Sequence, residues 1–212
     1  CKIAEIKLFD IALETTVDAE DRGNLLSDVS KPNVKFTDII GAESAKSELK
    51  YFVEYLKNPK AFSSKGLGVP KGVLFYGPPG TGKTMLAKAV AGESDVTFIC
   101  AEGNQFLKKY VGEGEETVHN LFATARKYAP TIVFIDEIDA IAKERKGGEV
   151  STDSILTAFL AEMDGFKTDA KKPIFVLAAT NFDVEPGTPK SLDPALLRRF
   201  DRHIYIDLPD KK

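Results

Sequence analysis

The stretch from Lys71 to Gly92 constrains the fold more strongly than any other part of this sequence. Residues 73–76 are apolar strand formers, residues 77–82 are rich in glycine and proline, and residues 83–91 are mostly helix formers. A strand, a glycine-rich loop and a helix in this order give the phosphate-loop pattern G-x-x-x-x-G-K-[ST] its structural context. An ordinary turn between a strand and a helix would not need every position of that pattern to be filled. The stretch therefore predicts a nucleotide-binding loop.

The residue types in this loop suit a bound nucleotide. Glycine at positions 80 and 82 lets backbone N–H groups turn toward a phosphate, and the start of the next helix adds partial positive charge. Lys83 can reach the β- and γ-phosphates, and the Thr84 hydroxyl can take one position on Mg²⁺. The residues predicted to bind the nucleotide here are Pro79, Gly80, Thr81, Gly82, Lys83, Thr84 and Met85.

A second group of polar residues follows the apolar run at 131–135. Asp136 and Glu137 come directly after this run, where an open α/β sheet binds its ligand. Phosphoryl transfer needs a carboxylate for Mg²⁺ and a group that orients or deprotonates the attacking water. Adjacent residues at a strand end point to different sides, so one carboxylate can face the metal and the other the γ-phosphate. A solvated acidic loop is the alternative interpretation.

Two further sets of residues could take part in the same chemistry. Asn181 ends an apolar run, and its side-chain amide could hold the attacking water, although asparagine after a strand also serves as a turn residue. Arg198, Arg199 and Arg202 lie close together in the sequence. Arginine suits the charge on a transferring phosphate, whether its own chain or a neighbour holds that phosphate. Ordinary surface charge is the alternative for these arginines.

Composition limits the other function classes. The chain is 43% hydrophobic and 29% charged with a net charge of −3, and no run of Lys or Arg predicts a nucleic-acid partner. No signal peptide is visible, and no stretch reaches the ~20 apolar residues of a membrane span. Cys100 closes an apolar run, which predicts a buried, reduced thiol and a reducing, cytoplasmic compartment. A start at Cys1 without methionine suggests a piece of a longer protein.

Apolar runs alternate with helical patterns from Val34 onward. The predicted strands are residues 73–76, 96–100, 131–135, 172–179 and 203–206, and the predicted helices are residues 45–55, 83–91, 115–128, 153–163 and 192–198. This alternation predicts an α/β fold, the three-layer αβα sandwich of a P-loop NTPase with a five-stranded, mainly parallel sheet. Residues 1–33 are expected to be a segment or linker of unknown role, with a half-buried strand at 2–8 and a polar connector at 18–31.

From about Val34 to its end the sequence resembles the large ATPase subdomain of AAA proteins. Four motifs carry the resemblance in order: GPPGTGKT at 77–84, IVFIDEID at 132–139, AATN at 178–181, and LDPALL at 192–197 with RFDR at 199–202. Within that class it is most similar to FtsH-type membrane-anchored AAA zinc metalloproteases. That similarity rests on PKGVL at 70–74, LAKAVAGE at 86–93 and EMDGF at 162–166.

The resemblance implies an ATPase and a role for each residue of the phosphate site. Lys83 and Thr84 would bind ATP–Mg²⁺, and Asp136 would serve the metal. Glu137 would activate water, and Asn181 would sense the γ-phosphate. The same resemblance implies that Ile40 and Gly41, which precede the first predicted helix, lie against adenine.

The resemblance also implies a homo-hexamer that acts on polypeptide. Arg199 and Arg202 would be fingers reaching into the neighbouring subunit's site, and Asp164-Gly165-Phe166 would report the nucleotide state between subunits. The segment Tyr110, Val111 and Gly112 falls where the family places the aromatic pore loop that grips a threaded chain. Three departures concern these features. FtsH-type proteins usually have Phe in the pore loop and a less charged flank, whereas KKYVGEGEE at 108–116 looks more like proteasomal or microtubule-severing relatives. The usual Pro-Gly between the first two arginines is missing, and the loop at 182–191 is longer than the family's.

Two hypotheses follow for the whole protein. In the first, this module unfolds or threads proteins and feeds a protease outside the sequence, which itself contains no H-E-x-x-H motif. In the second, it is a remodelling or scaffold module without a protease. The sequence is expected to stop before the small helical subdomain of the family. Any membrane attachment would come from segments outside it, and the module would then lie on the cytosolic face.

Overall fold

The computed structural model of the chain describes residues 28–64, 71–107, 112–143, 150–165, 173–185 and 191–208. The predicted strand at 2–8 lies outside these residues, as do Tyr110, Val111 and Phe166. In the part of the chain that the structure describes, no helix combines the length and the apolar character needed to cross a membrane.

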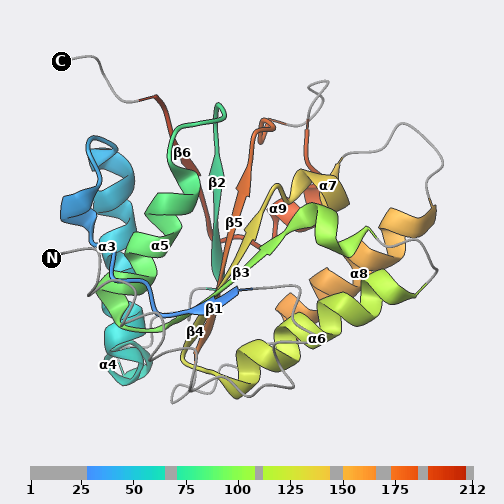
Figure 1. Cartoon of the computed structure of the whole chain (residues 1–212), viewed down its shortest axis with the longest axis horizontal. Coiled ribbons are helices and arrows are strands. Elements are labelled where there is room, and N and C mark those ends of the chain that lie inside the picture. The colour runs from blue at the N-terminus through green and yellow to red at the C-terminus, as the bar shows by residue number, and fades with distance from the viewer. Residues whose placement is uncertain are drawn as a thin grey trace, which may run out of the picture.

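A mixed sheet of six strands forms the centre of the domain (Figure 1). The strands are β1 (Asp28–Ser30), β2 (Gly72–Tyr76), β3 (Thr97–Glu102), β4 (Thr131–Asp136), β5 (Ile174–Thr180) and β6 (Arg202–Tyr205). They lie in the order β1-β3-β4-β5-β2-β6, and every pair except β1 with β3 is parallel. The carboxyl ends of the five parallel strands therefore meet at one edge of the sheet.

The five parallel strands confirm the prediction, and β1 corrects it. β1 lies in the segment expected to be a polar connector, and it pairs antiparallel with β3 in the register Asp28↔Cys100 and Val29↔Ile99. A short edge strand is held by backbone hydrogen bonds and is commonly polar, so its composition resembles that of a connector. Cys100 is half-buried rather than fully buried as predicted, and it takes part in no disulfide among the described residues.

Helices cover both faces of the sheet, which confirms the three-layer prediction (Figure 1). The α-helices are α3 (Glu43–Lys57), α4 (Pro59–Ser64), α5 (Lys83–Ser94), α6 (Glu113–Lys127), α7 (Asp139–Ala142), α8 (Val150–Asp164) and α9 (Pro194–Leu197). The 3₁₀ turn η1 (Phe36–Asp38) leads into α3, and the 3₁₀ turn η2 (Gly103–Phe106) follows β3. Asp193 is the N-cap of α9, and its Oδ1 accepts a 2.7 Å hydrogen bond from the Ala195 N–H.

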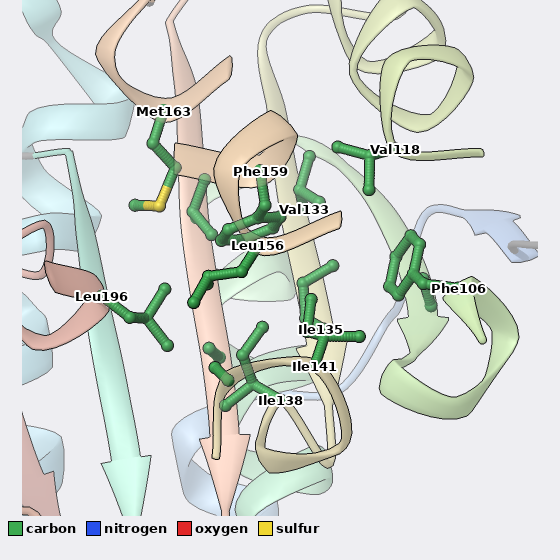
Figure 2. Packing of buried hydrophobic residues seen from close by; sticks show 14 of the residues in the cluster. Phe106, Val118, Val133, Ile135, Ile138, Ile141, Leu156, Phe159, Met163 and Leu196 are labelled. Atoms are coloured by element: carbon green, nitrogen blue, oxygen red, sulfur yellow. The ribbon is translucent and has the colours of Figure 1, made fainter. Parts of the chain in front are cut away.

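Alternate residues of each strand enter two separate cores. On one face, Phe75 and Phe134 pack with residues of α3 and α5. On the other, Val133 and Ile135 pack beneath α6 and α8, where Phe159 is fully buried (Figure 2). Side chains that alternate along a strand point to opposite faces, so a central strand buried on both sides reads as a continuous apolar run. The two cores fix the strand ends, and the strand ends carry the candidate site.

Candidate functional site

The loop between β2 and α5 has the backbone of a phosphate cradle. Gly77, Gly80 and Gly82 have φ angles of +136°, +76° and +85°, a region that side chains with a Cβ rarely adopt. At Gly77 the restriction is also steric, because a Cβ atom there would lie 2.3 Å from the Ile206 carbonyl oxygen. Gly82 is the N-cap of α5, whose first N–H groups have no partner within the helix. The loop therefore presents backbone donors and the positive end of α5 together.

Lys83 lies at the centre of this site. Its side chain is buried, with 7% of the residue exposed. The Nζ atom donates to the carbonyl oxygens of Gly77 (2.8 Å) and Pro78 (2.7 Å) and to Asn181 Oδ1 (2.9 Å). Burial lowers the pKa of Lys83, and the carboxylates of Asp136 and Asp139 act against that lowering. The lysine thus joins the phosphate loop to the end of β5.

Thr84 and Asp136 form a second contact between the loop and the sheet. Thr84 Oγ1 donates a 2.7 Å hydrogen bond to Asp136 Oδ2, and Asp136 Oδ1 accepts a 3.0 Å bond from the Glu137 N–H. A hydroxyl and a carboxylate are hard oxygen donors, and Mg²⁺ is usually bound by one or two such groups plus waters and phosphates. The described residues contain no cluster of three or more His, Cys, Asp or Glu side chains able to hold a metal. The pair fits a Mg²⁺ ion shared with a phosphate.

Glu137 follows β4 in an unusual conformation. Its φ angle is +52°, in the left-handed region that a glutamate rarely adopts. Its side chain is exposed, and Glu137 Oε2 accepts a 3.2 Å hydrogen bond from Asn104 Nδ2. Gly103 allows the backbone after β3 to lie against the backbone of Glu137, because a Cβ at position 103 would lie 2.2 Å from the Glu137 carbonyl oxygen. Sequence reasoning missed Asn104, although a polar residue just after β3 lies at the same sheet edge.

Ile40 and Gly41 lie in the turn between η1 and α3. Ile40 is 89% exposed, and Gly41 has a φ angle of +77°. Both line an open groove of about 780 Å³ whose described lining comes from η1, α3, the turn between them and Glu93 of α5, with no residue of 77–84. Met85, also predicted to bind nucleotide, is a partly exposed residue of α5. A contact of Ile40 and Gly41 with adenine, and of Met85 with the nucleotide, stays a prediction.

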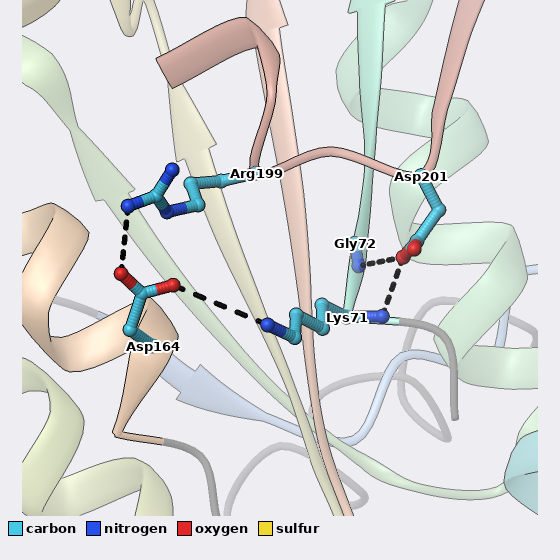
Figure 3. A network of polar contacts seen from close by, with 5 residues as sticks. All are labelled: Lys71, Gly72, Asp164, Arg199 and Asp201. Carbon is cyan, nitrogen blue, oxygen red and sulfur yellow. Dashed lines mark hydrogen bonds and ion pairs between the residues drawn. The ribbon is translucent and has the colours of Figure 1, made fainter. Parts of the chain in front are cut away.

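The two predicted arginine fingers lie at the other end of the strands. Arg199 Nη2 donates a 2.8 Å hydrogen bond to Asp164 Oδ2 at the end of α8, and Lys71 Nζ lies 4.0 Å from Asp164 Oδ1 (Figure 3). Arg202 opens β6 and pairs in register with Val73, near the start of β2. The phosphate loop follows the other end of β2. The structure therefore separates both arginines from the phosphate site of their own chain.

An aspartate fixes the backbone at this amino-terminal end. Asp201 Oδ2 accepts hydrogen bonds from the N–H groups of Lys71 (2.5 Å) and Gly72 (3.1 Å) (Figure 3). Arg199 Nε is buried and has no hydrogen-bond partner among the described residues. Hydrogen bonds therefore hold the segment that carries the arginines against the start of β2, while the Nε donor of Arg199 has no partner among the described residues.

The predicted pore loop is described only at its end. Gly112 is the N-cap of α6 with a φ angle of +90°, and Glu113 begins the helix. Tyr110 and Val111 lie outside the described residues, so a contact between this segment and polypeptide stays a prediction.

Comparison with known proteins gives one family and a consistent set of relatives. Residues 73–208 match the model of the ATPase family associated with various cellular activities (AAA). The chain is 53% identical over 187 residues to the ATP-dependent zinc metalloprotease FtsH of Thermus thermophilus, covering 85% of this chain and 29% of the relative. It is 50% identical over 192 residues to the FtsH of Helicobacter pylori, covering 87% and 29%.

A eukaryotic relative has a similar level of identity. The mitochondrial inner membrane m-AAA protease component AFG3L2 of Mus musculus is 50% identical over 186 residues, covering 85% of this chain and 22% of the relative. The chain therefore spans less than a third of the length of each of these three relatives.

Proposed function

Because the chain belongs to the AAA family of ATPases, we propose that it binds ATP with Mg²⁺ at the carboxyl-terminal edge of its sheet and hydrolyses the γ-phosphate bond. One observation carries the proposal. Lys83 bonds to Asn181, and Thr84 bonds to Asp136, so residues from three separate motifs meet at one sheet edge. The similarity to FtsH-type proteins supports a module that powers a longer protein.

The residues at this edge fit a nucleotide with its metal. The glycine loop and the start of α5 supply N–H donors for phosphate oxygens, and Lys83 supplies a cation. Thr84 and Asp136 would hold Mg²⁺, which neutralises charge on the β- and γ-phosphate oxygens when it is bound. Lys83 Nζ would exchange its carbonyl partners for phosphate oxygens, which are stronger acceptors.

The chemical step needs a base and a group that orients water. Glu137 would accept a proton from the attacking water while the water oxygen bonds to the γ-phosphorus. The bond from the γ-phosphorus to its bridging oxygen breaks, and ADP leaves with the electron pair. Asn181, held by Lys83, would orient the water or a γ-phosphate oxygen. Asn104 bonds to one oxygen of the Glu137 carboxylate, and the other oxygen can accept the proton.

Assembly into a ring, a homo-hexamer, would complete the site. Arg199 and Arg202 lie at the opposite end of the strands from their own phosphate loop, as expected of residues that serve a neighbour in a head-to-tail ring. The side chains of Arg199 and Asp164 are 31% and 46% exposed. An ion pair this accessible to solvent contributes only about 0–1 kcal/mol, so Arg199 can exchange Asp164 for a phosphate at little cost.

The work done by ATP hydrolysis would be the unfolding and threading of polypeptide into a protease. Two relatives carry the name ATP-dependent zinc metalloprotease, which supports this use of the module. The chain contains no H-E-x-x-H motif, so the zinc site would lie in another part of the protein. The name of the mouse relative places that protein at an inner membrane, which supports attachment of the ATPase to a membrane through another segment. A remodelling module without protease is the second candidate.

Glu137→Gln in the full-length protein tests the proposal. The amide has nearly the same size but cannot accept the water proton, so kcat should fall about 10²–10⁴-fold while ATP affinity stays within about threefold. Fluorescent-nucleotide binding and phosphate release measure the two quantities separately. Hydrolysis close to the parent rate would remove Glu137 from the mechanism. If the parent hydrolyses ATP but unfolds no tagged substrate, the threading role fails and the remodelling role stands.

A further inference from the structure

Thr180, the last residue of β5, makes two hydrogen bonds at the edge of the phosphate site. It is almost completely buried, with 1% exposed. Its Oγ1 donates a 2.6 Å hydrogen bond to Asp139 Oδ1 and accepts a 3.0 Å bond from the Phe182 N–H. A hydroxyl bound to a carboxylate at this distance is a short, charge-assisted hydrogen bond. Neither residue is proposed above to contact the nucleotide, the metal or the water, although the charge of Asp139 favours the charged form of Lys83.

The Thr180–Asp139 contact lies where the backbone pairing of β4 with β5 ends. The paired register stops at Ile135↔Ala178. Beyond that point the Ile138 N–H still donates a 3.0 Å hydrogen bond to the Ala179 carbonyl, and the Asp139–Thr180 contact follows one residue later. These two hydrogen bonds therefore hold the chain after β4 against the end of β5, beyond the last paired residues. The segment held in this way contains Asp136 and Glu137.

This attachment connects the two halves of the proposed catalytic group. Asn181 follows Thr180 directly and bonds to Lys83. Glu137 lies two residues before Asp139 and has a strained backbone conformation, which persists only where surrounding contacts impose it. The Phe182 N–H bonded to Thr180 lies just beyond Asn181, so Asn181 is held from both sides.

We propose that Thr180 and Asp139 are a positioning pair that sets the distance between Asn181 and Glu137, and so holds the attacking water between them. The proposal rests on the proposed ATPase function. The threonine suits this role because its branched side chain has few rotamers. A displacement of a catalytic group by about 1 Å can lower the reaction rate about 10²-fold. The loop that binds phosphate would keep its position, so nucleotide affinity would change little.

The variants Thr180→Val and Thr180→Ser, made in the full-length assembled protein, separate positioning from packing. Valine keeps the shape and removes both hydrogen bonds, whereas serine keeps the hydroxyl and loses only a methyl group. Thr180→Val should lower kcat about 10- to 100-fold with nucleotide affinity within about threefold, and Thr180→Ser should keep at least about half of the parent kcat. Equal loss in both variants, or affinity and kcat falling together, would overturn the proposal.

Asp139 gives an independent test if Thr180→Val fails to fold. Asp139→Asn keeps the Oδ1 acceptor and should stay near the parent rate, whereas Asp139→Ala should resemble Thr180→Val. Because the two residues act as one unit, the double variant Thr180→Val/Asp139→Ala should be no slower than the worse single variant. Additive losses in the double variant, or a normal kcat in Asp139→Ala, would contradict a positioning pair.

The parent protein and Glu137→Gln serve as controls in the same assays. If the parent shows no ATP turnover, or Glu137→Gln does not reduce it, the proposed function fails. If both controls behave as expected and Thr180→Val turns over normally, only the positioning role fails.

Discussion

The two ends of the parallel sheet carry different kinds of polar structure. At the carboxyl-terminal edge, Lys83 and Thr84 bond to Asn181 and Asp136, and the loop between β2 and α5 presents its backbone donors there. At the amino-terminal edge, Arg199 is paired with Asp164 (Figure 3). The first edge gathers binding groups from several motifs around one place. The second edge holds an ion pair between charged side chains, with the buried Arg199 Nε lacking a hydrogen-bond partner among the described residues.

This difference suggests a division of labour between chains. The carboxyl-terminal edge has the groups needed to bind a nucleotide within one chain. Arg199 and Arg202, which we propose as fingers, lie at the opposite edge, where the exposed Asp164 bonds to Arg199. If these arginines serve a neighbour, the site would bind within one chain and would reach full rate only when a neighbour presents its amino-terminal edge. Changes at the two edges should therefore affect different measured quantities.

The largest effect is expected from Arg199→Ala in assembled protein. A finger supplied by a neighbour stabilises transition-state charge, so kcat should fall about 10³-fold or more, while ATP affinity stays near the parent value. Steady-state hydrolysis and nucleotide binding measure the two quantities. The lost pair with Asp164 costs little stability because it is exposed to solvent. A large fall in affinity would place Arg199 in ground-state binding instead.

Lys83→Ala should have the opposite profile. It removes a charge-assisted contact worth about 1.5–3 kcal/mol, which corresponds to about 10- to 150-fold in ATP affinity. Titration with a fluorescent ATP analogue at fixed Mg²⁺ measures the change. Lys88, on the same helix and exposed, offers a matched control, since Lys88→Ala should bind normally. Unchanged affinity in Lys83→Ala would mean that this loop is not the site.

The smallest effect is expected at a third charge group, which joins α6 to α8. Glu162 of α8, with 13% of its side chain exposed, bonds to His119 (2.7 Å) and Arg126 (2.8 Å) of α6. Burial acts to raise the pKa of Glu162, but these two hydrogen bonds outweigh it and the pKa is lowered. A lowered carboxyl pKa means that the ionised form stabilises the fold. His119 is half-exposed and pairs with this carboxylate.

Glu162→Gln should lower the free energy of unfolding by about 1 kcal/mol at pH 7, because both of its partners are half-exposed. The contribution is fully present above the unfolded pKa of 4.5 and is lost as the pH falls through the lowered folded value. Denaturant unfolding at pH 7 and below pH 4 measures the difference between parent and variant, which should shrink in acid. A change in ATP affinity would show that Glu162 is coupled to the phosphate site.

The sequence predicts those parts of the fold and of the site whose pattern lies in residues that follow one another in the chain. Buried parallel strands are continuous apolar runs, and the phosphate loop is a contiguous pattern, so both can be recognised locally. The rule that ligands bind at the carboxyl ends of strands then gathers Lys83, Asp136 and Asn181 at one edge. In the structure Lys83 bonds to Asn181, and Thr84, the next residue, bonds to Asp136.

Contacts between distant segments could not be predicted in the same way. Strand β1 has only three residues, two of them polar, and it pairs with a strand about 70 positions away in the sequence. The bond from Asn104 to Glu137 and the pair of Arg199 with Asp164 join residues 33 and 35 positions apart. Such contacts depend on the packing of the elements between them, and polar side chains have no period that would reveal their partners.

Mixing two inactive chains tests the division of labour most directly. An Arg199→Ala chain has an intact phosphate site, and a Lys83→Ala chain has an intact Arg199. Random mixing in equal amounts should create complete sites at about a quarter of the interfaces of a head-to-tail ring. ATP hydrolysis should therefore rise well above that of either variant alone. No rise in oligomers shown to contain both chains would contradict a site completed by the neighbouring subunit.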